Sequence, residues 1–155
     1  MAPLHPDQVI ARAKVLFDQL RTLQIWEASL TSAAVPELTP LFVTSLDTAW
    51  ASYAIASIRD ATGITARFAF DSSTGEFLEG EGVSIGGGHL APYVAESAAL
   101  HAFPPPLATP DIVWKPCRQS VTRFRPFWRF TVGGAVRYVR SDGEVFDWLT
   151  TDIRG

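Results

Sequence analysis

Seven basic side chains and no acidic one lie between residues 112 and 140, and these residue types suit anion recognition. Arginine donates paired hydrogen bonds that match a carboxylate or a phosphate. Residues 1–111 carry twelve acidic and five basic side chains, so the basic segment is local. Because the whole chain has a net charge of −3, we expect a carboxylate-bearing partner or a small anion rather than nucleic acid. The seven residues are Lys115, Arg118, Arg123, Arg125, Arg129, Arg137 and Arg140.

An alternative interpretation gives these basic residues no ligand. In it they pair within the chain with acidic residues of the first half, namely Glu76, Glu79 and Glu81. Ion pairs of this kind at a protein surface contribute little to stability and need no function. The sequence alone does not decide between a binding surface and internal pairing.

The last strands place several candidate binding residues on one sheet face. If both glycine-containing turns within residues 127–149 are two-residue turns, this segment forms a three-stranded antiparallel meander. Arg129, Tyr138 and Asp147 then form one row across the strands. Cation–π contacts and ion pairs could also make this face a stable solvent surface without function. The predicted binding residues are Phe127, Arg129, Tyr138, Arg140, Asp147 and Arg125.

A catalytic interpretation needs a different set of residues. In a cone-shaped α+β fold of the NTF2-like kind, a curved sheet and helices enclose a pocket that can host proton transfer. The protein would then be a small cyclase or isomerase acting on an apolar metabolite. Such a site requires a titrating group inside an apolar pocket. The candidates are Asp47, Tyr53, His89 and Tyr138.

The sequence predicts neither a metal site nor a cofactor. Its three histidines, His5, His89 and His101, have no partner at metal-ligand spacing. The single cysteine, Cys117, excludes an internal disulfide and is expected to be a buried thiol. No cationic leader precedes an apolar run, and no segment approaches the roughly 20 apolar residues of a membrane span. We therefore expect a soluble, cytoplasmic protein that does not engage a membrane.

The first half of the chain, residues 5–82, is predicted to hold one helix and three strands. Pro6 and Asp7 suit the first turn of a helix with apolar residues at helical spacing. Pro36 and Pro40 then indicate a loop. Strands are predicted at residues 48–58, 64–70 and 76–80. The second of these alternates apolar and polar residues, which is typical of a half-buried antiparallel strand.

The second half, residues 89–150, repeats this order after a glycine-rich connector. A short alanine-rich helix is predicted at residues 91–102. The meander follows it, with Trp128 and Trp148 on the core side. Such large aromatic residues are expected to dominate the packing of a small core.

One hairpin of each half shares a pattern. Segments starting at Arg67 and at Arg137 each contain an alternating strand, a turn ending in Gly-Glu and an apolar strand, which makes Gly75 equivalent to Gly143. With 47% hydrophobic residues, the chain can bury one sizeable core. The predicted fold class is α+β: two helix-plus-antiparallel-meander halves forming one compact single domain, residues 1–155.

The aromatic strand at residues 127–130 and the sequence Tyr-Val-x-x-Asp-Gly-Glu-Val at 138–145 follow a predicted helix. In this order they resemble PepSY domains, which are small cystatin-like modules of peptidase propeptides and stand-alone proteins. The resemblance covers residues 90–149 well and 6–80 loosely, so the first half would be a diverged tandem copy. Several members of that family inhibit or hold peptidases. The resemblance implies a cystatin-like fold and a binding role rather than a reaction.

We therefore favour a non-catalytic binding or regulatory module that engages a protein or peptide through the aromatic and arginine-rich face. The pocket enzyme is the alternative. A small-molecule ligand, and a homo-oligomer formed through open sheet edges, are further partners that the sequence leaves open.

Overall fold

The computed structural model describes residues 3–22, 34–82, 89–93, 99 and 110–151. Contacts divide the chain into two compact units. Unit 1 comprises Met1–Phe42 and Ser52–Pro92, and unit 2 comprises Val43–Ala51 and Tyr93–Gly155. Residues 43–51 thus cluster with the second half of the sequence rather than with the first.

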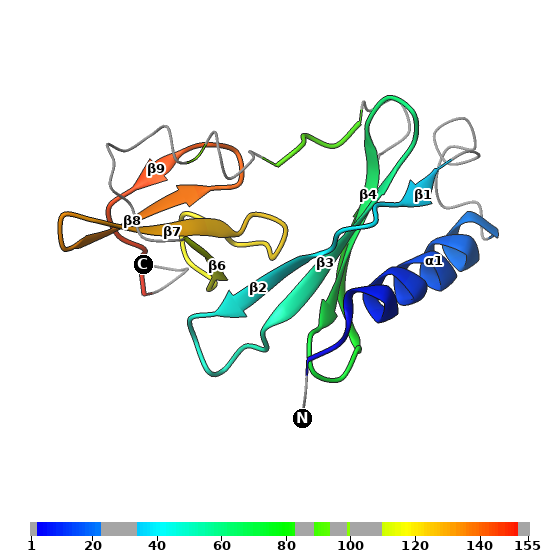
Figure 1. Ribbon diagram of the computed structural model, residues 1–155, viewed down its shortest axis with the longest axis horizontal. Coiled ribbons are helices and arrows are strands. Elements are labelled where there is room, and N and C mark those ends of the chain that lie inside the picture. Colours follow the sequence, from blue (N-terminus) through cyan, green and yellow to red (C-terminus); the bar gives the residue numbers. More distant parts are fainter. Residues whose placement is uncertain (1–2, 23–33, 83–88, 94–98, 100–109, 152–155) are drawn as a thin grey trace. The chain divides into compact units, whose positions relative to one another are not determined.

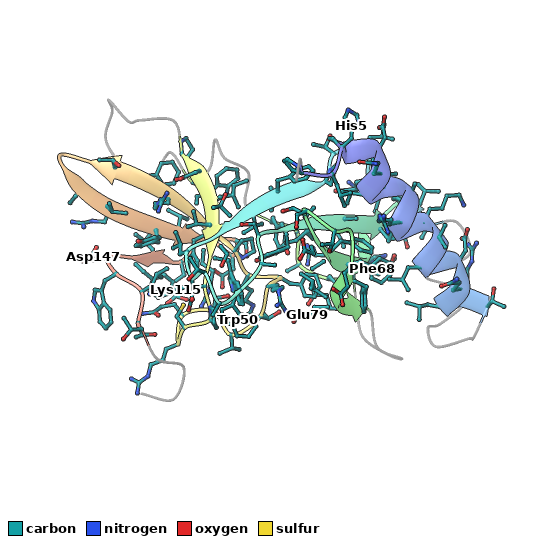
Figure 2. The ribbon with its side chains drawn as sticks, turned by 90° about the horizontal axis from the view of Figure 1, so that it is seen from below. His5, Trp50, Phe68, Glu79, Lys115 and Asp147 are labelled. Carbon is teal, nitrogen blue, oxygen red and sulfur yellow. The ribbon has the colours of Figure 1, made fainter. Side chains whose placement is uncertain are left out.

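Unit 1 begins with helix α1 (Pro6–Thr22), whose start is capped by His5. The Asp7 backbone N–H donates to His5 Nδ1 (3.3 Å), while the His5 N–H donates to Gln8 Oε1 (2.8 Å). This reciprocal capping satisfies N–H groups that a helix start leaves unpaired. Figure 2 shows His5 at that end of the helix. The first predicted helix is confirmed, and its buried residues are Val9, Ala13 and Phe17.

Four strands of unit 1 pair antiparallel in the order β5-β4-β3-β1. Their bounds are Val35–Pro36 (β1), Tyr53–Arg59 (β3), Ile64–Asp71 (β4) and Phe77–Gly82 (β5). Helix α1 lies along one face of this sheet (Figure 1). Alanines on the strands allow the helix to approach closely, and large rings fill the remaining space. The core there includes Val9, Ala13, Phe17, Ala54, Ala56, Ile58, Ala66, Phe68 and Phe70.

Strand β4 is buried on both faces, so the prediction of a half-buried strand is wrong. Thr65 and Arg67, expected to face solvent, are 1% and 4% exposed. Both side chains find hydrogen-bond partners within unit 1: Thr65 Oγ1 donates to the Ile58 carbonyl (3.2 Å), and Arg67 Nη1 donates to Glu81 Oε1 (3.0 Å). Polar groups can be buried when they are hydrogen-bonded in this way. The alternation of apolar and polar residues in β4 therefore did not predict which of its side chains are exposed.

In the described part of unit 2, strands pair in the order β2-β6-β7-β8-β9. Their bounds are Leu41–Ser45 (β2, which begins in unit 1), Asp111–Trp114 (β6), Phe127–Val132 (β7), Ala135–Arg140 (β8) and Val145–Phe146 (β9). Strands β2 and β6 are parallel, and the other pairs are antiparallel. Parallel neighbours need a long crossover connection. Here residues 46–110 provide it, and they include strands β3, β4 and β5 of unit 1.

The predicted fold class, two helix-plus-meander halves, is wrong. The described residues form nine strands and a single helix, which is a β-rich fold. Pro36, expected in a loop, lies in β1, a short edge strand where the missing N–H is tolerated. Strands β2 and β6 were not predicted. Of the second predicted helix, residues 91–93 are not helical, and the rest apart from Ala99 lies outside the described residues.

The first turn of the meander agrees with the prediction. Gly133 and Gly134 have φ angles of 57° and 82°, as a two-residue hairpin turn of type I′ requires. The register across it pairs Phe130 with Arg137 and Trp128 with Val139. The pairing of β7 and β8 was therefore predictable from turn chemistry alone.

The second turn differs by one residue from the prediction. The Gly143 N–H donates to the Arg140 carbonyl (2.7 Å), and the Arg140 N–H donates to the Glu144 carbonyl (2.8 Å). Gly143 has a φ of 94°, so residues 141–143 form a three-residue turn with a bulge. A slip of one residue turns the following side chains to the other face. Trp148, predicted to be buried, is 65% exposed.

The two hairpins that share a sequence pattern have similar turns of different length. Gly75 and Gly143 both end a turn with positive φ, and the Glu after each accepts the N–H that closes the hairpin. The closing residues are Asp71 and Arg140. The first turn is one residue longer than the second. Arg67 therefore lies four positions before its closing residue, Asp71, whereas Arg137 lies three positions before Arg140. The two arginines therefore occupy opposite faces of their hairpins and are not equivalent.

Candidate functional site

A polar hollow of about 420 Å³ lies on one face of strands β6, β7 and β8. The strand register brings its residues together: Asp111 pairs with Arg129, and Arg129 pairs with Tyr138 on the next strand. Thr131 and Val136 form the adjacent cross-strand pair. Side chains of directly paired residues share one face of a sheet. We call this group, Asp111, Arg129, Thr131, Val136 and Tyr138, the Arg129 hollow.

An ion pair forms one wall of the Arg129 hollow. Arg129 Nε donates to Asp111 Oδ1 (3.0 Å), and Arg129 Nη2 donates to Asp111 Oδ2. These hydrogen bonds hold the pKa of the Asp111 carboxyl below its usual range, and they raise the pKa of Arg129. Because the folded-state pKa of Asp111 is lowered, the pair stabilises the fold above the usual aspartate range and stops doing so as the pH falls through the lowered pKa.

The hollow combines donors and acceptors with little net charge. Arg129 and Asp111 neutralise each other, while the hydroxyl groups of Thr131 and Tyr138 can donate or accept hydrogen bonds. Val136 adds an apolar surface and is 40% exposed. This composition suits a polar, uncharged group such as a peptide main chain. None of these side chains is paired with a base as an activated nucleophile would be.

Arg140, a predicted binding residue, is held by its own unit. Its guanidinium donates to both carboxylate oxygens of Asp142 (2.9 and 2.6 Å), to Glu144 (2.5 Å) and to the Gln119 carbonyl (2.7 Å). It also lies 5.4 Å from the centroid of the Phe146 ring. The hydrogen bonds to Asp142 raise the pKa of Arg140. These contacts make Arg140 a structural link between two turns and a strand.

The other predicted binding residues are placed differently from one another. Phe127 is fully buried, and its ring makes edge contacts with Tyr138 and Phe146 at 6.1 and 6.2 Å. Arg125 is exposed, and no ion pair joins it to another described residue. Asp147 lies 3.1 Å from Arg137, on the face opposite the Arg129 hollow. The predicted row is corrected: Phe146, not Asp147, follows Tyr138 in register.

Three arginines of the basic segment form ion pairs, but not with the acids that the internal-pairing interpretation named. The partners are Asp111 for Arg129, Asp147 for Arg137, and Asp142 and Glu144 for Arg140. All four acids lie just outside the ends of the segment 112–140 in sequence. Strand pairing brings them across from the arginines. Counting acids only inside the segment therefore concealed the pairing of these three arginines.

The candidates for a catalytic pocket do not converge within unit 1. Tyr53 is fully buried at the start of β3, and its strand partner is Asp71. His89 contacts Asp60, which follows the end of the same strand. A strand of this length places its ends roughly 20 Å apart. Tyr53 and His89 therefore cannot act on one substrate atom within this unit.

His89 contacts two residues through a single nitrogen. Its Nε2 lies 2.8 Å from Asp60 Oδ2 and 3.1 Å from Thr62 Oγ1. A proton relay needs both ring nitrogens, one for the nucleophile and one for the acid. The contact with His89, together with N–H groups of the turn, lowers the pKa of Asp60. These contacts hold His89 against the β3–β4 turn. Next to them, the Leu90 N–H donates to the Ile64 carbonyl (2.9 Å).

The two catalytic candidates of unit 2 are also separated. Asp47 Oδ1 accepts the Ala49 N–H (2.9 Å), which fixes a turn after β2. That turn adjoins the last residue of β6, because the Leu46 N–H donates to the Trp114 carbonyl. Tyr138 instead lies across from the first residue of β6, through Arg129. In the part of the chain that the structure describes, no group of three or more metal-ligand side chains occurs.

Sequence reasoning identified Arg129 and Tyr138 but missed Asp111, Thr131 and Val136. A strand before β7 was not predicted, so Asp111 had no assigned neighbour. Extending the antiparallel pairing one strand further would have placed it opposite Arg129. The short apolar run Ile112-Val113-Trp114 was the available signal for that strand.

Comparisons with protein-family models, curated proteins and solved structures found no match. The resemblance to PepSY domains therefore stays a prediction. Among the described helices, none has the length and apolar character needed to cross a membrane.

Proposed function

We propose that the protein is a non-catalytic binding module that engages a protein or peptide through the Arg129 hollow. The observation that supports this most is the hollow itself. It joins a two-point arginine–carboxylate pair, two hydroxyl groups and one exposed apolar side chain on adjacent strands. Rigid strands hold these groups in a fixed arrangement, as recognition of a defined segment requires.

An uncharged polar segment is the proposed ligand, and a polyanion is not. In the hollow, Arg129 is neutralised by Asp111, and on the same sheet face Arg140 is neutralised by Asp142 and Glu144. Nucleic-acid binding depends on cations that are free to replace condensed counterions. A peptide main chain offers N–H and C=O groups that complement Asp111, Arg129 and Tyr138 without displacing the ion pair.

The proposed place of action is the cytoplasm. Cys117 is a fully buried free thiol, and burial raises its pKa. A protein with one such thiol has no disulfide to maintain and suits a reducing compartment. The raised pKa also makes Cys117 a poor nucleophile, which agrees with a binding role.

Replacing Arg129 by glutamine should strongly weaken peptide binding. A displayed library of random linear peptides is panned on the wild-type protein, and enriched peptides are synthesised for affinity measurement. We expect their affinity for Arg129→Gln to fall about tenfold or more, because arginine at the centre of a site usually contributes strongly to binding.

Arg137→Gln is the matched control. Arg137 lies across the β7–β8 turn, is 35% exposed against 34% for Arg129, and also pairs with an aspartate, but it occupies the opposite face. Its replacement should leave the affinity unchanged. Failure of panning to enrich any peptide above a bare surface, or equal binding by Arg129→Gln, would overturn the proposal.

A further inference from the structure

A second surface feature lies on unit 1 and is independent of the Arg129 hollow. An open groove of about 590 Å³ runs between α1 and the β4–β5 turn. Its walls are mainly apolar, and each carries one charged residue. The residues that matter here are Arg12, Val15 and Leu16 of the helix, and Phe70, Glu76 and Phe77 of the hairpin.

Two large apolar side chains at this groove are unusually open to solvent. Val15 is 59% exposed and Phe77 is 47% exposed. The Phe77 ring makes edge contacts with Phe68 and Phe70 at 6.3 and 6.1 Å, so it is fixed in place while part of it stays uncovered. Adjacent exposed apolar residues beside a concave surface are typical of an interaction site.

The charges of the groove are of opposite sign and stay unpaired. Among the described residues, neither Arg12 nor Glu76 makes an ion pair. The Arg12 guanidinium is packed over Gly75, where an added Cβ would lie 2.5 Å from Arg12 Cζ. Gly75 has a φ of 76° and no side chain, so the turn leaves room for this placement. The groove therefore presents a positive group on one wall and a negative group on the other.

We propose that this groove is the interface of a two-fold symmetric dimer, and that its occupant is α1 of a second copy of the chain. A two-fold axis places each surface residue against its counterpart's neighbours, so a self-complementary surface is required. Arg12 of one copy then faces Glu76 of the other, and the reverse, which satisfies both charges. Val15, near the middle of α1, then packs against the apolar wall of the partner's groove, as helix packing favours.

Reversing the charges at positions 12 and 76 tests whether these two residues meet across the dimer interface. In a dimer of Arg12→Glu, two negative residues face each other at each of the two contacts, and in a dimer of Glu76→Arg two positive ones do. Either single variant should dimerise at least about tenfold more weakly than the wild type. Sedimentation velocity over a range of protein concentrations at low salt measures this, because surface charge contacts weaken as salt rises.

Mixing the two single variants should restore dimerisation. In a mixed dimer, the carboxylate introduced at position 12 of one copy faces the guanidinium introduced at position 76 of the other. The second contact keeps the original Arg12 and Glu76, so both contacts are attractive. The double variant Arg12→Glu, Glu76→Arg should also regain the wild-type association. If the charges act only within one chain, the double variant regains its internal charge complementarity but the mixed single variants do not, so the mixture is the deciding test.

Val15→Lys tests the apolar part of the interface. It should abolish dimerisation, while its exposed helical position should keep the melting temperature near that of the wild type. Circular dichroism of each variant checks the fold. A wild-type protein that stays monomeric at all concentrations, or single variants whose mixture does not associate, would overturn the proposal. These outcomes are independent of peptide binding at the Arg129 hollow.

Discussion

Replacing Trp114 by alanine is expected to lower the free energy of unfolding by about 3–5 kcal/mol, because it removes a large ring from the core of unit 2. Trp114 is 1% exposed, and its ring lies 5.7 Å from that of Trp50 in an edge arrangement. Its indole N–H donates to Ser120 Oγ (3.2 Å), and Arg123 lies over the ring at 5.5 Å. Urea unfolding followed by tryptophan fluorescence and circular dichroism measures the change.

Trp148→Ala is the matched control for this prediction. The same residue type is 65% exposed at this position, so its loss should change the free energy of unfolding by less than about 0.5 kcal/mol. A large loss for Trp148 would show that the register of β8 and β9 is wrong, and a small loss for Trp114 would contradict its place in the core of unit 2.

Arg140→Gln is expected to have the next largest effect on stability. The change removes hydrogen bonds to Asp142, Glu144 and the Gln119 carbonyl from a side chain that is 14% exposed. Hydrogen bonds to charged groups contribute about 1.5–3 kcal/mol, and we expect a loss in that range. Chemical unfolding at neutral pH gives the value.

The loss of stability caused by Arg140→Gln should become smaller at low pH. Hydrogen bonds from Arg140 lower the pKa of Asp142, so this contribution is present above the ordinary aspartate range and is lost as the pH falls through the lowered pKa. The stability gap between wild type and Arg140→Gln should therefore narrow below about pH 4. Arg118→Gln, at an exposed position, should show almost no gap at any pH. A gap that stays constant in acid would contradict the assigned contacts.

Local patterns predicted the elements that depend on neighbours in sequence. Pro6 and the helical spacing of Val9, Ala13 and Phe17 located α1, and Gly133-Gly134 fixed the register of β7 against β8. These features depend on residues within one helix or hairpin. Short-range physical rules therefore apply to them directly.

Features that depend on distant residues were not predictable in this way. The parallel pairing of β2 with β6 joins Thr44 to Val113, and no local pattern reports such a partner. Burial of Arg67 depends on Glu81 and on the Ala91 carbonyl, which accepts its Nη2 (2.5 Å). Both cases show tertiary contacts overriding a local pattern.

The candidate site was predictable only in part, for the same reason. Arg129 and Tyr138 face each other across one hairpin and were placed together. Asp111, which neutralises Arg129, comes from a third strand separated from it by a long loop. Without Asp111, the Arg129 guanidinium would make the hollow a site for anions. The Asp111 carboxylate balances that charge, so the hollow is nearly neutral. One unpredicted strand thus changed the expected chemistry of the ligand.

Mapping a bound peptide on the ¹⁵N-labelled protein tests the central claim most directly. A peptide selected on the wild type is titrated while backbone amide shifts are followed by NMR. We expect the largest shifts at Asp111, Arg129, Thr131, Val136 and Tyr138, and none of them with Arg129→Gln. Shifts centred on another surface, or an unchanged map in Arg129→Gln, would contradict the assignment of the Arg129 hollow as the binding site.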